Sequence, residues 1–397
     1  MQSTVHRILV LLVFFALFVA ACATDDAEEP AAPTDESDEA DESDEADEAD
    51  DSGTEADDGD EDHPQLALRH SNTGTPALAV EQGTIWWIDE LGTRSGGNID
   101  VEPFWAHALV PPGEELAGLE GGTAELVTMN TAYVDQSFPL FAISSIPFIT
   151  VHPDVQTRAL RTLLEENELF QDEFERHGLK PLYFKQLAPM TIGTTGTFEQ
   201  LDDLQGQRLR IASPYGAIGL DAVGSDGVFL SFPEIYESIE RGTVDGYNEV
   251  PLEIAVFSDQ HTLVNHITDP GWGQYQGLVV VMRQDAWDEL PAHTQGLIED
   301  VSHEQYEVSY DALFEAEQEA CDIALEADVT VTRLPEAEID RWREMVVDDF
   351  FETWIEMAVD AGVSEDDAQA FLDRYLELVD EYEETPEWAP IAECVAR

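Results

Sequence analysis

The chain has 397 residues, of which 86 are acidic and only 17 are lysine or arginine, giving a formal net charge of −69 at pH 7. Nucleic-acid binding needs basic patches that face phosphates, so this composition excludes that class of partner. The acidic excess is too large to belong to one site. We interpret it as adaptation to a salty exterior, where salt screens the self-repulsion of the chain.

The first 21 residues form a targeting segment. His6-Arg7 precedes an apolar run at residues 8–21, which is shorter than the roughly 20 residues of a membrane-spanning helix. A signal peptide therefore fits better. Residues 19–22, VAAC, resemble a bacterial lipobox, in which Cys22 becomes the lipidated first residue of the mature protein. The alternative is a plain signal peptide that is cleaved near an Ala-x-Ala site, with Cys22 incidental.

Residues 22–62 form an acidic tether. From residue 23 to residue 62 there are 22 aspartates and glutamates and no lysine or arginine. Such a segment has no apolar surface to offset the entropy of ordering, so we expect it to be disordered. Its r.m.s. reach is on the order of 35 Å, from about 5–6 Å × √n. The alternative is an acidic tail that binds a metal or a protein. A lipid anchor and this tether together predict a protein on the outer face of the cytoplasmic membrane, or in the periplasm.

Residues 63–397 are enough for two lobes of ordinary size. In the first half, period-two and helical patterns predict strands and helices in alternation. The expected strands are 66–70, 99–104, 124–129, 182–187 and 190–193, and the expected helices are 78–93, 115–121 and 153–175. Strands that alternate with helices are typical of a parallel α/β sheet, whose ligands sit at the carboxyl ends of the strands. Residues 182–187 are expected to cross from one lobe to the other.

The pattern is clearest at residues 202–252. Residues 208–211 alternate basic and apolar side chains, which places Arg208 and Arg210 on one side of a strand. A helix at 218–223, a strand at 228–230, a helix that begins at Phe232 and a strand that begins with residues 244–247 follow. Further along, two helices within 287–326, a strand at 329–332 and helices at 335–361 and 364–383 are expected. Arg210 stands at a strand's carboxyl end, where a parallel sheet binds its ligand.

Short motifs occur in a fixed order along the chain. They are GGNIDV at 96–101, ISSIPF at 143–148, LQGQRLR at 204–210, FPEIY at 232–236, GTVDG at 242–246, PL at 251–252 and WDELP at 287–291. This ordered set resembles the solute-binding proteins of TRAP transporters, the tripartite ATP-independent periplasmic systems. The resemblance covers about Leu66 to Gln305.

The resemblance implies a two-lobed, periplasmic-binding-protein-like α/β fold, with a long helix within 291–325 that spans both lobes. Lobe I would comprise residues 63–187 and about 276–315, and lobe II residues 188–275 and about 316–397. It also implies a protein that captures a small organic acid and delivers it to a small and a large TRAP membrane subunit.

The resemblance makes Arg210 the leading site residue, because the family's arginine at this place forms a two-pronged salt bridge with the ligand carboxylate. The chemistry agrees, since a planar guanidinium matches two carboxylate oxygens and stays charged. The alternative is a surface ion pair with one of many nearby acids. Some family members carry a second arginine where this chain has Met190 or a neighbour. The acidic-sugar specificity known in the family is therefore not carried over.

Other positions that match the family's contacts are Asn130, Ser71 or its neighbour Asn72, and Asn248, with Phe232 packing on the apolar part of the ligand. One additional residue near Asn248 leaves the register open, so Glu249 is an alternative that would face a ligand ammonium or a bridging cation. Trp272, on a glycine-rich loop, is a further candidate for the cleft. For each position the alternative is a structural role: a turn, a cap, a solvated charge or a packed side chain.

Cys321 and Cys394 are the cysteines that remain besides Cys22. In an oxidising exterior they can form a disulfide that pins the C-terminal segment, and two free buried thiols are the alternative. No nucleophile elbow, metal-ligand cluster, phosphate loop or dinucleotide fingerprint occurs, so we expect a binding protein with no cofactor rather than an enzyme. A sensory binding protein that presents its ligand to a membrane receptor is the alternative function, and a secreted enzyme of the same fold is a second one.

Overall fold

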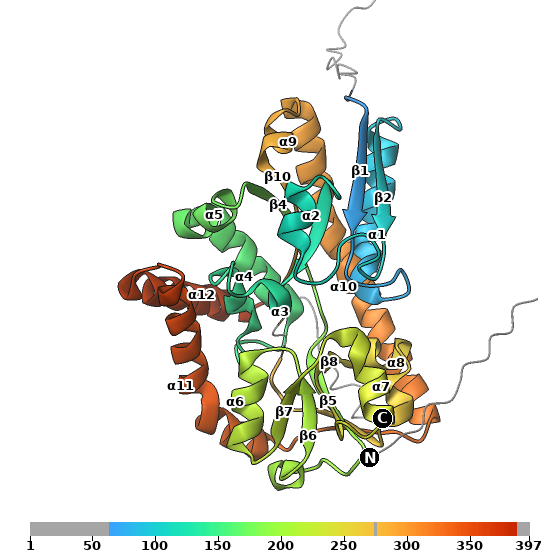
Figure 1. Ribbon diagram of the computed structural model, residues 1–397, viewed down its shortest axis with the longest axis vertical. Helices are drawn as coiled ribbons and strands as arrows, with labels where there is room; N and C mark the ends of the chain where they lie inside the picture. Colours follow the sequence, from blue (N-terminus) through green and yellow to red (C-terminus); the bar gives the residue numbers. More distant parts are fainter. Residues whose placement is uncertain (1–62, 274–275, 387–397) are drawn as a thin grey trace, which may run out of the picture. The chain divides into compact units, whose positions relative to one another are not determined.

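The computed structural model describes residues 63–273 and 276–386 (Figure 1). They form two mixed β-sheets covered by helices. The first sheet has the strand order β2-β1-β3-β10-β4. Its strands are β1 (Leu66–Ser71), β2 (Ile99–Phe104), β3 (Leu126–Asn130), β4 (Leu179–Lys185) and β10 (Leu278–Arg283).

The second sheet has the order β11-β9-β5-β8-β6-β7. Its strands are β5 (Met190–Thr194), β6 (Arg208–Ile211), β7 (Asp226–Phe229), β8 (Gly246–Pro251), β9 (His266–Asp269) and β11 (Thr330–Arg333). The two-lobed α/β class predicted from the sequence is therefore confirmed, with a sheet in each half of the fold.

Neither sheet is wholly parallel, in contrast to the prediction. In the first sheet β10 runs antiparallel to β3 and β4, and in the second β5 runs antiparallel to β8 and β9. Both are strands by which the chain enters a sheet from the other one: β5 follows β4, and β10 follows β9. Their direction is set by these crossings, because a strand that arrives from the other sheet is not preceded by a helix that returns it to a parallel path.

On the first sheet the helices are α1 (Gln82–Arg94), α2 (Glu115–Glu120), α3 (Thr131–Val134), α4 (Pro153–Glu166), α5 (Glu168–Glu175) and α9 (Gln284–Asp288). The sequence predicted a single helix at 153–175, and this prediction is wrong because the helix is interrupted at Asn167. Asn167 leaves the helical conformation and its side chain accepts from the backbone N–H of Phe170, so it caps a new helix. A capping asparagine competes well with helix continuation.

With the second sheet lie α6 (Pro214–Ala222), α7 (Ile235–Glu240), α8 (Leu252–Phe257) and α11 (Glu336–Asp360). The start of α6 is fixed locally, because the Ser213 side chain accepts from the N–H of Gly216 and Pro214 occupies the first turn. The 3-10 turn Phe232–Glu234 begins with a capping box between Ser231 and Glu234. These caps hold α6 and Phe232 at the ends of β6 and β7.

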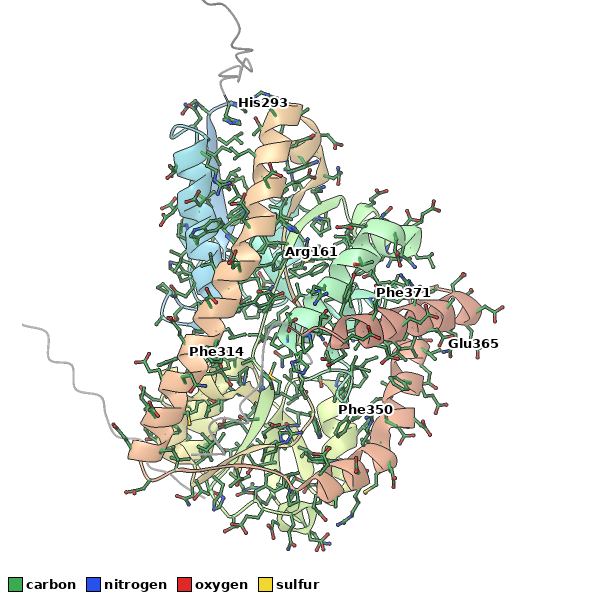
Figure 2. All side chains as sticks on the ribbon, turned by 180° about the vertical axis from the view of Figure 1, so that it is seen from behind. Arg161, His293, Phe314, Phe350, Glu365 and Phe371 are labelled. Carbon is green, nitrogen blue, oxygen red and sulfur yellow. The ribbon has the colours of Figure 1, made fainter. Side chains whose placement is uncertain are left out.

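The long helix expected near the C-terminal third is α10 (Ala292–Glu326). It contacts α1 and β4 of the first sheet, and α8 and β11 of the second. From His293 near its beginning, the helix passes Phe314 on its way to the second sheet (Figure 2). The prediction of a helix that spans both halves is confirmed. Cys321, on this helix, is disulfide-bonded, whereas Cys22 and Cys394 lie outside the described residues.

The final helix, α12 (Glu365–Glu383), packs against α4 of the first sheet. Phe371 of α12 contacts the ring of Phe170 at 5.5 Å and stacks on Trp354 of α11 at 5.9 Å (Figure 2). The lobe boundaries given above stay a prediction. α12 contacts α4, which lies within residues 63–187, and also α11, which the sequence placed in the second lobe together with α12.

The signal peptide, the lipobox at Cys22 and the acidic tether all lie outside the described residues. Among the helices that the structure describes, none combines the length and the apolar character needed to cross a membrane.

Candidate functional site

A cavity of about 250 Å³ is lined by residues that belong to both sheets. From the first sheet come the loop after β1, the end of β3 and the start of α3; from the second come β6, the turn after β7 and the end of β8. Of the predicted site residues, Asn130, Arg210, Phe232 and Glu249 line this cavity. The carboxyl ends of β3 and β6 thus meet there, as expected for an α/β ligand site.

Arg210 is buried, with 3% of its surface exposed. Its Nε donates to the carbonyl of Leu230 at 3.0 Å, and its Nη1 donates to the carbonyls of Asn248 and Glu249, both at 3.2 Å. These bonds fix the plane of the guanidinium. A buried cation that is fixed in this way is suited to pair with an anion.

Arg208, on the same side of β6, has a different environment. Its side chain is 45% exposed and its Nη2 lies 3.3 Å from Asp245. The same Nη2 donates to the carbonyl of Gly242 at 3.0 Å. The surface ion pair that was the alternative for Arg210 is therefore found at Arg208.

Glu249 reaches the cavity through an unusual backbone conformation, with φ of 65°. Its carboxylate accepts from the backbone N–H of Ala212 and from the hydroxyl of Ser213, at the start of α6. Burial raises the pKa of Glu249, and the nearby charge of Arg210 opposes this shift. A Cβ on Gly216 would come within 3.0 Å of this carboxylate, so glycine leaves the space that Glu249 occupies.

Asn130 ends β3 and caps α3. Its Oδ1 accepts from the N–H of Ala132 at 2.8 Å, so the group it can offer a ligand is the Nδ2 donor. Tyr133, one helical turn further on, also lines the cavity, and its ring meets that of His107 edge-on at 6.1 Å. Burial raises the pKa of Tyr133 and lowers that of His107. Both residues are therefore neutral at pH 7.

Sequence reasoning missed His107 and Gln276, which also line the cavity. No local pattern marked them. Tyr133, which also lines the cavity, lies in the short helix α3 that Asn130 caps.

Three predicted contact residues lie outside the cavity lining. The hydroxyl of Ser71 accepts from the N–H of Val110 at 3.2 Å, and residues 73–75 line the cavity in its place. Asn248 is fully buried, and its Oδ1 accepts from the N–H of Glu249 at 2.9 Å. The positive φ of Glu249 turns the chain here, so that Glu249 rather than Asn248 meets the cavity.

Trp272 is fully buried rather than exposed in a cleft. Its ring lies 4.8 Å from that of Trp342 and 6.0 Å from that of Phe148. Gly273, with φ of 79°, approaches the carbonyl of Thr150 so closely that a Cβ there would be 1.9 Å from it. The glycines thus fold this loop inward and bring the indole into the core.

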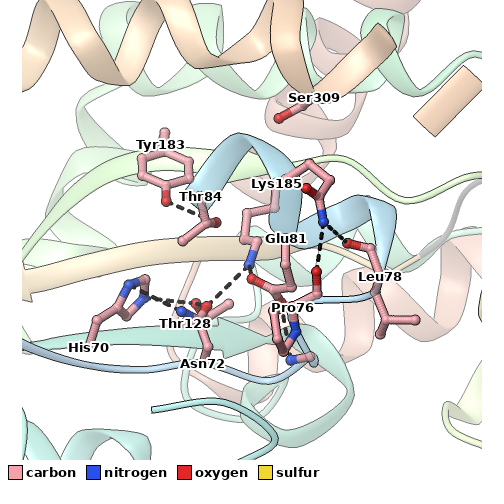
Figure 3. Close-up of polar contacts among 12 residues, drawn as sticks. His70, Asn72, Pro76, Leu78, Glu81, Thr84, Thr128, Tyr183, Lys185 and Ser309 are labelled. Carbon is pink, nitrogen blue, oxygen red and sulfur yellow. Dashed lines mark hydrogen bonds and ion pairs between the residues drawn. The ribbon is translucent and has the colours of Figure 1, made fainter. Parts of the chain in front are cut away.

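A buried polar network supports the cavity wall (Figure 3). The Nζ of Lys185, at the end of β4, donates to Glu81 and, at 3.2 Å, to the Oδ1 of Asn72. Glu81 also accepts from the N–H of Gly74 at 3.1 Å, and Thr128 donates to Asn72 at 2.8 Å. This network, which we call the Lys185 network, holds the loop that carries residues 73–75.

Within residues 63–273 and 276–386, no group of three or more His, Cys, Asp or Glu side chains could hold a metal ion. The chemistry that these residues offer is recognition: a fixed cation, several donors and apolar walls.

Comparison with known proteins agrees with this description. The family model for "Bacterial extracellular solute-binding protein, family 7" matches residues 71–356. The C4-dicarboxylate-binding periplasmic protein DctP of Rhodobacter capsulatus is 23% identical over 284 residues, which is 71% of this chain and 84% of that protein.

Solved structures agree as well. A TRAP periplasmic solute-binding protein from Desulfovibrio salexigens superposes with a TM-score of 0.70 at 22% identity, covering 81% of this chain and 98% of the other. A TRAP solute-binding protein from Rhodoferax ferrireducens has a TM-score of 0.71 at 20% identity, with 80% and 99% covered. The chain therefore belongs to bacterial extracellular solute-binding protein family 7, the solute-binding proteins of TRAP transporters.

Proposed function

We propose that this TRAP solute-binding protein holds its ligand, a small organic acid, by a salt bridge between the ligand carboxylate and Arg210, and then delivers it to the TRAP membrane subunits. The observation that carries the proposal is a buried arginine, fixed by three carbonyl bonds, in the wall of a cavity between the two sheets. A planar guanidinium that is held in one orientation matches the two oxygens of a carboxylate.

The ligands named for similar structures support this proposal. The Rhodoferax ferrireducens protein was obtained with benzoate, a Desulfovibrio salexigens protein with orotic acid and a Bordetella bronchiseptica protein with mandelate. All three are carboxylic acids, and a carboxylate is the group that the planar fork of an arginine binds best.

Asn130 and Phe232 join Arg210 in the proposed site. Asn130 offers its Nδ2 donor to a carboxylate oxygen, and Phe232 offers an apolar surface to the body of the ligand. Ser71, Asn248 and Trp272 then act from behind the cavity, through the bonds and ring contacts described above. Ligand contacts with both sheets would favour the closed arrangement over an open one by a population shift.

We also propose that Cys22 is lipidated, so that the protein works on the outer face of the membrane. The lipobox-like residues 19–22 and the acidic stretch after them support this localisation. A Cys22→Ala variant that still incorporates a labelled lipid would contradict it. Sensing through a membrane receptor is the second candidate, because the closed form of a binding protein can bind either a receptor or the membrane subunits of a transporter.

The test of the proposed site is a thermal-shift measurement at high salt on the mature, unlipidated chain, with a panel of carboxylates, neutral sugars and amines. A ligand that binds only the native state stabilises it by RT ln(1 + [L]/Kd), about 2.7 kcal/mol at about 100 times Kd. We expect a carboxylate to stabilise the wild type and not Arg210→Gln.

Arg208→Gln is the matched control, because it removes an arginine from the same face of the same strand. It should leave the shift unchanged. Circular dichroism of both variants excludes misfolding as the cause. A neutral sugar or an amine that stabilises the protein, while no carboxylate does, would overturn the proposed site.

A further inference from the structure

The residues that line the cavity beside Arg210 restrict the chemistry of the ligand. Among the described lining residues, Arg210 is the single arginine or lysine. Around it lie apolar side chains that are almost fully buried. They are Leu78, Val80, Leu187, Val250, Ile254 and Leu278. One cation in an apolar chamber can neutralise one carboxylate, and a second ionised group placed against these walls would lose its hydration without gaining a partner.

Glu249 is the acidic residue of the cavity lining, and its carboxylate has partners within the protein. Both carboxylate oxygens of Glu249 are engaged at the start of α6, by the N–H of Ala212 and the hydroxyl of Ser213. The Glu249 carboxylate is thus already bound within the protein, so an ammonium group on the ligand would have to displace these bonds. The lining therefore disfavours amino acids as well as dicarboxylates.

Polar side chains of the lining differ in burial. Thr75 is exposed and Thr73 and Ser258 are half-buried, so that besides Arg210 and Glu249 the buried polar side chain among the described lining residues is Gln276. The Oδ1 of Asn130 is already used as a helix cap. A sugar acid carries several hydroxyl groups, each of which needs a partner when buried, and unmatched hydroxyls lower affinity strongly. The interior of this cavity supplies few such partners.

The volume of the cavity limits the size of the apolar part of the ligand. A dry cavity of about 150 Å³ accommodates benzene, and this cavity measures about 250 Å³. A single six-membered ring with one carboxylate and a small substituent fits that space. The rings of Tyr133 and Phe232, one from each half of the fold, belong to the lining and offer faces or edges to such a ring.

We propose that the ligand is a monocarboxylate with an apolar body of about one aromatic ring, seated between Tyr133 and Phe232 with its carboxylate on Arg210. This inference rests on the proposed carboxylate site and narrows its ligand class. It separates this chain from a binder of C4-dicarboxylates or sugar acids, which would need a second cation or a polar interior.

Matched probes test the inference by titration calorimetry at high salt on the mature chain. Benzoate and benzene-1,4-dicarboxylate share one ring and differ by a second carboxylate. We expect benzoate to bind about tenfold or more tightly than the dicarboxylate, because the second charge has no partner. Cyclohexanecarboxylate should bind in the range of benzoate, and succinate and glucuronate more weakly than both.

Phe232→Ala tests the ring contact. It should weaken benzoate about fivefold to tenfold, the scale of one lost aromatic contact. Phe229→Ala is the control, because Phe229 is 60% exposed and absent from the lining. It should leave affinity unchanged, and equal losses in the two variants would overturn the proposed ring contact.

Two failures remain distinguishable. If succinate or glucuronate binds more tightly than benzoate and loses its binding in Arg210→Gln, the carboxylate site stands and the apolar ligand class is overturned. If no carboxylate depends on Arg210, the proposed function and this inference are overturned together.

Discussion

Glu249 and Arg210 are close enough in the cavity wall for their charges to interact. Burial raises the pKa of Glu249 above its ordinary value near 4.5. Below that raised pKa Glu249 is neutral and does not compete with the ligand carboxylate for the charge of Arg210. Above it, ionised Glu249 compensates Arg210 and repels the ligand.

Carboxylate affinity should therefore fall as pH rises through the raised pKa of Glu249, in a window that begins above pH 4.5. Titration calorimetry with benzoate across this range measures the effect. Glu249→Gln keeps the shape of the side chain and removes the charge, so its affinity should not show this decline. Identical pH profiles in wild type and variant would exclude Glu249 as the titrating group.

Lys185 and Glu81 form a buried ion pair, with 2% and 0% of their side chains exposed. Lys185→Met leaves the Glu81 charge without its partner, and breaking a buried pair in this way costs about 3–5 kcal/mol. We expect this loss to appear in the free energy of unfolding, measured by denaturant titration at high salt. Benzoate affinity should fall too, because Glu81 and Asn72 hold the loop of residues 73–75.

The double variant Lys185→Met/Glu81→Leu is the control. Removing both charges should recover much of the stability, so the two single effects should not add. Strict additivity would show that the pair contributes nothing as a pair.

At the scale of elements, α8 and α10 meet through two buried acids. Glu253 of α8 and Glu317 of α10 are 0% and 4% exposed. Burial raises the pKa of Glu253 to about 8, and burial together with the charges of Glu253 and Asp269 raises that of Glu317 well above its usual range. Ionisation of either acid is thus disfavoured in the folded protein.

Since the folded state binds the protons of these acids more tightly than the unfolded state, stability is present at low pH and is lost as pH rises. The free energy of unfolding should fall between about pH 5 and 8, the interval from the ordinary pKa to the raised pKa of Glu253. Denaturant titrations at four pH values measure this slope. Glu253→Gln/Glu317→Gln should flatten it, and a variant with an unchanged slope would place the titrating groups elsewhere.

At the scale of the whole molecule, acidic side chains far outnumber basic ones. Residues 63–397 carry 64 acidic and 16 basic side chains, a difference of −48. Salt shortens the Debye length from about 10 Å at 0.1 M to about 3 Å at 1 M, which screens most repulsion between exposed charges. Compact folding should therefore become more favourable as salt is added.

We expect the free energy of unfolding to rise steeply between dilute buffer and molar salt. Thermal and denaturant unfolding of the mature chain measure it, and the chain beginning at His63 shows how much of the effect belongs to residues 63–397. Equal stability at low and high salt would contradict the interpretation of the acidic surface as adaptation to a salty exterior.

Local patterns predicted much of the fold because they act over a few residues. The strand at 99–104 has the predicted bounds, and α11 and α12 differ from the predicted helices only at their ends. The helix predicted to begin at Phe232 begins there, as a 3-10 turn with a capping box from Ser231. The break at Asn167 was missed, because the sequence shows only an asparagine within a helical pattern. Its role as a cap is visible only in the structure, where the backbone leaves the helical conformation.

The sequence by itself determined the α/β class, the family and the position of Arg210 at the end of β6. Periodicity, caps and ordered motifs depend only on residues that are close to one another in the sequence. Only the tertiary structure decided which candidates share a cavity. Trp272 is drawn into the core by packing on Trp342, and Glu249 replaces Asn248 at the cavity through one positive φ. Such outcomes depend on contacts between segments far apart in sequence, and local patterns do not encode them.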